Sequence, residues 1–210
     1  MAIVIHGGFW RPAYNLDHMG HFCAALTRAG VATWNIEYRR MEQNGGDWRV
    51  TTADVLLAAN FVLKLDAPVD TTRVVVMGFS AGGHLALWLA SQKQRLALRG
   101  AISLAGVADL RRAAELQLSN NVTRDFLGAD PNYPEASPIE RLPFGIPTRL
   151  IHGTEDDTVP YEISVRFEKA ARAAGDDCRL VTCTGAGHTE VADPLSKEWP
   201  VVQASLLDLI

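Results

Sequence analysis

Apolar runs of strand length alternate with segments of helical periodicity along most of this 210-residue chain. The apolar runs predict strands at 3–6, 31–38, 73–79, 100–106, 148–153 and 178–185. Apolar positions at helical spacing predict helices at 15–29, 52–65, 82–92, 160–175 and 197–210. Residues 109–145 interrupt the alternation and are rich in Pro, Asn and Asp. This composition predicts an irregular insertion with short helices.

The predicted strands are apolar throughout rather than alternately apolar and polar. Such strands are typical of a parallel sheet that helices cover on both faces, so the chain is assigned to the α/β class. We expect one domain over residues 1–210, with 109–145 as a short, cap-like insertion. Chemistry in parallel sheets gathers at the carboxyl ends of the strands, where the candidate residues are sought.

Composition excludes several classes of function. The formal net charge is −4 and Lys and Arg form no basic cluster, which argues against a nucleic-acid partner. Three cysteines with no C-x-x-C pair are typical of buried thiols in a reducing compartment. The start of the chain lacks the pattern of a signal peptide, and no stretch has the length of a membrane span. These features predict a cytoplasmic protein with no membrane partner.

The segment "GFSAGG" lies between an apolar strand and an apolar helix and matches G-x-S-x-G. A Gly-rich connection without function is the alternative interpretation. The strand–turn–helix context favours a nucleophile elbow, in which Ser80 stands exposed on a strained turn at a helix N-terminus. Gly78 and Gly82 are expected there because side chains at these positions would collide.

A serine nucleophile needs a base and an acid, and the chain order Ser, acid, His is typical of one class of hydrolase. His188, in "GAGHTEV", is the candidate base. Asp156 in "HGTEDDTVP" is the favoured acid, with Asp157 as the runner-up and Asp109 as a more distant alternative.

"HGGFW" follows the first predicted strand and has the composition of an oxyanion loop. We expect the backbone amides of Gly8 and Phe9, together with that of Ala81, to bind an oxyanion. Trp10 and Trp48 are candidates for the substrate pocket, although Trp10 fits core packing equally well.

His18 and His21 lie one helical turn apart, which is a spacing compatible with a shared metal ion. No third ligand is evident, so the sequence favours a solvated helix face. No metal site is predicted.

The segments "HGGFWR", "NIEYRR", "GFSAGGHLA", "HGTEDDTVP" and "GAGHTEVADP" together resemble the α/β-hydrolase superfamily. Within it they are similar to the branch of kynurenine formamidase (arylformamidase) and related small carboxylesterases. The resemblance implies a mostly parallel sheet, no metal or organic cofactor, and hydrolysis through an acyl- or formyl-enzyme. It places the nucleophile, acid and base at Ser80, Asp156 and His188.

Members of that branch usually carry two further strands before the one that ends in "HGG". The sequence therefore predicts an α/β-hydrolase fold that lacks its first two strands and has no large cap. In the family's sheet order the strand at 31–38 then lies at an edge. Two outcomes fit such an edge: a homodimer that pairs or buries it, which is favoured, or a marginally stable protein prone to aggregation.

Three functions fit these residues. The first is a serine hydrolase that cleaves small or medium carboxylic esters, and the second is an arylformamidase acting on N-formylkynurenine. Both take a small-molecule substrate, an ester or a formamide, through the same chemistry. The third is an inactive binding protein on the same fold, which is disfavoured because Ser80, Asp156 and His188 are all present.

Overall fold

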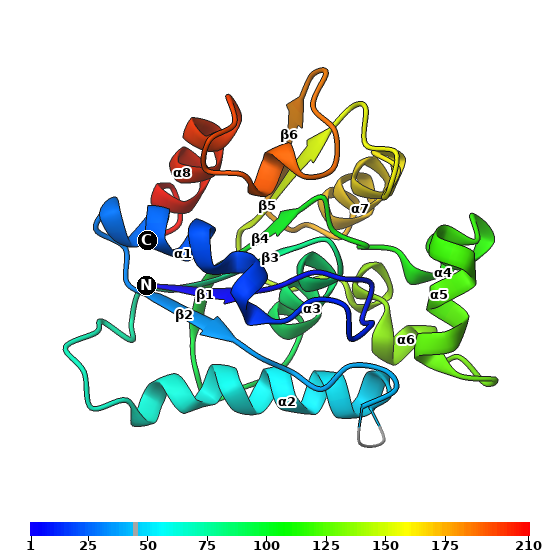
Figure 1. The fold of residues 1–210 in the computed structure, drawn as a ribbon, viewed down its shortest axis with the longest axis horizontal. Coiled ribbons are helices and arrows are strands. Elements are labelled where there is room, and N and C mark those ends of the chain that lie inside the picture. The colour runs from blue at the N-terminus through cyan, green and yellow to red at the C-terminus, as the bar shows by residue number, and fades with distance from the viewer. Residues whose placement is uncertain (44–45) are drawn as a thin grey trace.

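A single parallel sheet organises the molecule (Figure 1). The computed structural model describes residues 1–43 and 46–210, and positions 44–45 of the loop predicted before Trp48 lie outside this range. The strands of the sheet, in the order β2-β1-β3-β4-β5-β6, are all parallel to their neighbours. Their bounds are β1 Ala2–Ile5, β2 Thr33–Ile36, β3 Val74–Phe79, β4 Leu98–Leu104, β5 Thr148–Gly153 and β6 Cys178–Cys183. The α/β-hydrolase fold predicted from the sequence is confirmed.

Helices cover both faces of the sheet. On one face, α1 (Gly20–Arg28) and α8 (Trp199–Leu207) enclose an apolar cluster with the strands. On the other, α2 (Trp48–Phe61), α3 (Ala81–Ala90) and α7 (Glu162–Ala173) enclose a second one. Short 3-10 helices are η1 (Leu16–Met19), η2 (Val62–Lys64), η3 (Pro138–Arg141) and η4 (Glu190–Ala192). Among the described residues, no helix is both long and apolar enough to cross a membrane.

The insertion predicted at 109–145 contains short helices, as expected. These are α4 (Leu110–Glu115), α5 (Leu118–Leu127) and α6 (Tyr133–Ala136), followed by η3. Figure 1 shows α4, α5 and α6 together at one side of the molecule. Aromatic and apolar residues of this insertion join the cluster on the α3 face, so the insertion is packed onto the domain.

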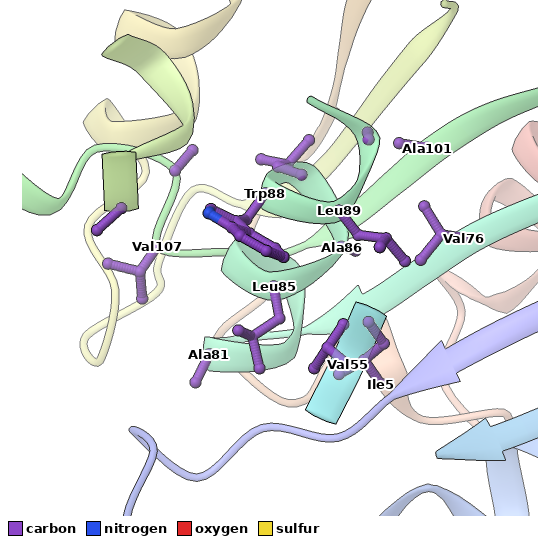
Figure 2. Packing of buried hydrophobic residues seen from close by; sticks show 14 of the residues in the cluster. Ile5, Val55, Val76, Ala81, Leu85, Ala86, Trp88, Leu89, Ala101 and Val107 are labelled. Carbon is purple, nitrogen blue, oxygen red and sulfur yellow. The ribbon is translucent and has the colours of Figure 1, made fainter. Parts of the chain in front are cut away.

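Helix α3 is the centre of the core and carries the elbow serine at its N-terminus. Every residue from Ala81 to Ala90 is buried. In Figure 2 the side chains of Leu85 and Leu89 lie among those of Ile5, Val55 and Val76. Burial of one such side chain stabilises the fold by about 1.5–3 kcal/mol. The helix that presents Ser80 is therefore held from all sides.

Helix α2 begins at Trp48, earlier than the predicted start at residue 52. The carboxylate of Asp47 accepts a hydrogen bond from the backbone N–H of Val50 at 2.9 Å. This N-cap satisfies a donor that the first turn leaves free, and so the helix extends toward its N-terminus. The apolar positions at helical spacing from which the helix was predicted begin only at Val55.

Strand β2 forms one edge of the sheet, as predicted. Its side chains are partly covered, because Ile36 is buried and the indole N–H of Trp34 donates to the carbonyl of Ala58 at 3.0 Å. The ring of Trp34 stacks on that of Phe61, which is itself 48% exposed. Pairing of this edge with a second copy stays a prediction.

Candidate active site

The turn between β3 and α3 holds Ser80 in a conformation that side-chain-bearing residues rarely adopt, with φ 57° and ψ −119°. A Cβ on Gly78 would overlap the backbone of Gly82, and a Cβ on Gly82 would overlap the backbone of Ile5. Both positions therefore require glycine, because backbone rather than side chains would collide. The turn has the strained geometry of a nucleophile elbow.

The loop after β1 packs directly against this elbow. A Cβ on Gly7 would lie 2.9 Å from the carbonyl oxygen of Phe79 and 3.1 Å from the Cβ of Ser80. The following residues Gly8 and Phe9 have φ values of 111° and 49°. In the described part of the chain, the backbone amides of Gly8, Phe9 and Ala81 donate to no other protein group. Three unused N–H groups thus remain beside the serine.

His6 and Tyr38 anchor the start of this loop. The Tyr38 hydroxyl donates to the carbonyl of His6 at 2.8 Å, and the two rings stack with their centroids 4.3 Å apart. Nε2 of His6 lies 2.9 Å from a carboxylate oxygen of Glu37, which also contacts Arg40. Burial lowers the pKa of His6, although the hydrogen bond with Glu37 opposes the shift. Residues of "NIEYRR" therefore hold the start of the loop after β1 in place.

Trp10 connects the loop to α3 and to the insertion. Its indole N–H donates to Nδ1 of His84 at 3.2 Å, and its ring stacks on Phe126 at 4.3 Å. Nε2 of His84 lies 2.9 Å from the carbonyl of Ala136 and is therefore the protonated nitrogen. Burial lowers the pKa of His84 to about 4, so this imidazole is neutral near pH 7.

Neither tryptophan predicted for the substrate pocket has a surface that faces an open pocket. Trp10 is 0% exposed and Trp48 is 4% exposed. Trp48 is buried at the start of α2, with the Arg49 guanidinium 4.9 Å from the centre of its ring. Because both residues are buried, they belong to the core, and their expected role in the substrate pocket is corrected. Trp10 instead positions the loop that precedes it.

Asp156 and His188 meet at the carboxyl ends of β5 and β6. Nδ1 of His188 lies 2.7 Å from Oδ2 of Asp156. Oδ1 of Asp156 accepts the backbone N–H groups of Thr158 and Val159 at 2.9 and 2.8 Å. Burial would raise the pKa of Asp156, but its hydrogen bonds with His152 and His188 outweigh burial and hold that pKa well below the usual range. The carboxylate is therefore ionised at neutral pH and fixes His188 with Nδ1–H as the donor.

The other candidate acids lie elsewhere. Asp157 is exposed and accepts a hydrogen bond from the Thr158 hydroxyl at 3.1 Å. Asp109 caps α4 through the N–H of Arg112 at 2.9 Å and pairs with Arg166 at 3.0 Å. Neither carboxylate contacts His188 in this structure.

A second imidazole, that of His152, contacts Asp156, and it was not singled out from the sequence. Nε2 of His152 lies 3.0 Å from Oδ2 of Asp156 and 2.8 Å from the carbonyl of Val159. Both partners are acceptors, so Nε2 carries the proton, and Nδ1 accepts the Ser164 hydroxyl at 2.7 Å. The sequence offered one signal of this contact: His152 lies at the end of β5, four residues before Asp156.

His188 reaches the elbow through Phe79, the residue before Ser80. The two ring centroids lie 4.8 Å apart. In this structure the Ser80 hydroxyl and His188 form no hydrogen bond. Such bonds are often long in the absence of substrate and tighten when it binds. The arrangement brings a strained serine, a base and an ionised carboxylate to one end of the sheet.

A cleft of about 270 Å³ adjoins His188, between the start of α1 and the loop after β6. His18 and His21, expected on a solvated face, line this cleft. No cluster of three or more metal-ligating side chains occurs within residues 1–43 and 46–210. A larger cavity of about 740 Å³ lies at the other end of α3, around Ala90 and Leu96, and therefore away from Ser80.

Fold and site together define an α/β-hydrolase. A family model described as the prolyl oligopeptidase family matches residues 9–199, so the chain belongs to this family. The resemblance to the α/β-hydrolase superfamily is thereby confirmed. The closer resemblance to the arylformamidase branch stays a prediction.

Similar proteins include an acyl-protein thioesterase 1 from Emericella nidulans, 31% identical over 137 residues. The match covers 64% of this chain, which spans about half (48%) of that relative. Esterase B from Lactobacillus rhamnosis has the same fold, with a TM-score of 0.86, 19% identity, and coverage of 99% of this chain and 74% of that one. Thermogutta terrifontis esterase 2 in its propionate-bound form has a TM-score of 0.77 and 26% identity, covering 99% and 79% of the two chains.

Proposed function

We propose that this protein is a serine esterase that hydrolyses carboxylic esters with small or medium acyl groups. The observation that carries this proposal is the ionised Asp156 carboxylate, which orients His188 at 2.7 Å on the same side of the sheet as the strained Ser80. Nucleophile, base and orienting acid are the parts that acyl transfer requires. The similarity to an esterase bound to propionate supports a short acyl group.

The reaction begins when Ser80 Oγ attacks the ester carbonyl carbon and its proton passes to Nε2 of His188. The carbonyl oxygen becomes an oxyanion, which the amides of Gly8, Phe9 and Ala81 stabilise. His188 then returns the proton to the leaving alcohol oxygen as the C–O bond breaks, and an acyl-enzyme remains. Water attacks this ester by the same route, releases the acid and restores the Ser80 hydroxyl.

Ester hydrolysis by wild-type protein and by Ser80→Ala tests the proposal. We expect p-nitrophenyl acetate and butyrate to be turned over, with kcat about a million-fold lower in the variant. A fluorophosphonate probe should add its mass to a peptide that contains Ser80. Absence of both turnover and labelling would favour the inactive binding protein.

Acyl-chain length tests the substrate class. Each methylene contributes about 0.8 kcal/mol only where an apolar wall buries it. The insertion at 109–145 is packed onto the domain, and Trp10 and Trp48 are buried, so these residues offer little wall to a long chain. We therefore expect the acetate and butyrate esters to have a higher kcat/KM than the palmitate ester.

N-formylkynurenine belongs in the same assay, because formamide hydrolysis uses identical steps and releases formate. A kcat/KM on N-formylkynurenine far above that on p-nitrophenyl acetate would replace the esterase proposal by the arylformamidase alternative.

A further inference from the structure

The cleft beside His188 has a lining that the reaction steps above do not use. Its walls include His18, His21 and Phe22 from η1 and α1, Phe79 from the elbow, and Thr189 and Asp193 after β6. The cleft has a volume of about 270 Å³ and is partly open to solvent, so it is large enough for one small ring.

The position of the cleft indicates which part of an ester it would bind, the acyl group or the alcohol. The ring of His18 lies 5.9 Å from that of Phe79, and Phe79 lies 4.8 Å from His188. Phe79 is therefore a wall shared by the cleft and the base. His188 must reach the alcohol oxygen to protonate it, so the alcohol lies on the imidazole side while the carbonyl oxygen faces the amides. The cleft is placed to receive the leaving alcohol.

The two imidazoles of the cleft are free to bind a ligand. Across residues 1–43 and 46–210, neither imidazole of His18 and His21 forms a side-chain hydrogen bond with the protein. Burial, followed by the nearby imidazoles of His6 and His188, lowers the pKa of His18. A neutral imidazole offers one donor and one acceptor, which matches hydroxyl groups.

The charge of the cleft restricts the ligand further. Asp193 places a carboxylate in the lining, one oxygen of which accepts the N–H of Leu195 at 2.8 Å. An anionic alcohol would be repelled by this group. Phe22 and Phe79 line the cleft but are only 1% and 4% exposed, so the imidazoles and the Asp193 carboxylate supply the surface that a ligand contacts.

We propose that this cleft binds the alcohol portion of the ester, and that this alcohol is a neutral, polyhydroxylated ring such as a sugar. His18 and His21 hydrogen-bond its hydroxyls. The proposal rests on the esterase function and adds the class of leaving group to it.

Two acetates that differ only in their hydroxyl groups test this specificity. One is a methyl hexoside acetylated on its primary hydroxyl, and the other is cyclohexylmethyl acetate, with the same acyl group and a six-membered ring. For the wild-type protein we expect kcat/KM to favour the hexoside at least tenfold. His18→Leu and His21→Leu should each lower this ratio roughly tenfold, which corresponds to the loss of about 1.4 kcal/mol. Arg28→Leu, exposed at the far end of α1, should leave it unchanged.

The outcomes separate this inference from the esterase proposal. Hydrolysis of p-nitrophenyl acetate together with equal turnover of the two ring acetates would overturn the sugar-binding cleft alone. Absence of any hydrolysis would overturn the esterase. Binding then still tests the cleft: saturation-transfer NMR should detect the acetylated hexoside on the Ser80→Ala protein and lose it on Ser80→Ala with His18→Leu. Absence of binding to Ser80→Ala at millimolar hexoside would contradict the cleft assignment.

Discussion

Two imidazoles approach the same oxygen of Asp156, but they lie in different surroundings. The side chain of His152 is 0% exposed, and both of its nitrogens have partners inside the protein. The side chain of His188 is 12% exposed, and only its Nδ1 contacts the carboxylate. The comparison teaches that contact with an acid does not by itself define a catalytic base. In the proposed mechanism the base is the imidazole whose second nitrogen remains available to a substrate, which is His188.

The test with the largest expected effect removes the imidazole of His188, and with it the available nitrogen. His188→Ala should lower kcat on p-nitrophenyl acetate by on the order of a million-fold, because members of such a unit are not replaceable singly. Circular dichroism should show an unchanged fold, since His188 is partly exposed. Activity within tenfold of the wild type would show that another group accepts the serine proton.

The second test alters the carboxylate that both imidazoles share. Asp156→Asn should lower kcat roughly ten-thousand-fold, because an amide N–H can oppose the donor nitrogen of His188 and favour the wrong tautomer. Asp157→Asn is the matched control, one residue away and exposed, and should change kcat less than threefold. The reverse pattern would identify Asp157 as the orienting acid.

Sequence reasoning found the parts of this site that local rules determine. The elbow is recognisable because Gly78 and Gly82 have no alternative where backbone passes so close. The fold was predictable because central strands such as β1 and β3 are apolar on both faces and alternate with segments of helical periodicity. His152 was not recognised as a partner of Asp156, because that contact depends on how the loop after β5 folds back against α7. The burial of Trp10 depends on where the insertion brings Phe126 and Ala136, which periodicity along the chain does not show.

The third test concerns the positioning imidazole. His152→Leu removes a hydrogen bond to a buried carboxylate, a contact worth about 1.5–3 kcal/mol, and should lower kcat roughly tenfold to a hundredfold with little change in KM. His152→Gln keeps an N–H donor at this position and should recover most of the loss. Equal losses in both variants, or a loss confined to KM, would contradict a role in orienting Asp156.

The last test uses a buried imidazole that faces no carboxylate. His84 bonds only to Trp10 and to the carbonyl of Ala136, and burial lowers its pKa from 6.5 to about 4. Between these values the unfolded chain binds more protons than the folded one, so stability falls as the pH falls. The contribution of His84 is complete above pH 6.5 and is lost progressively toward pH 4; the total is roughly 3 kcal/mol.

His84→Gln isolates this contribution, because glutamine can accept from Trp10 and donate to Ala136 without titrating. Urea unfolding at pH 7, 5.5 and 4.5 should give a free energy of unfolding that declines less steeply in the variant. The slopes should differ by up to about 1.4 kcal/mol per pH unit, the value for one proton. His6, whose pKa burial also lowers, contributes equally to both proteins and cancels in the difference. Identical slopes would show that the pocket of His84 opens to water before the chain unfolds, so that burial alone does not keep an imidazole neutral here.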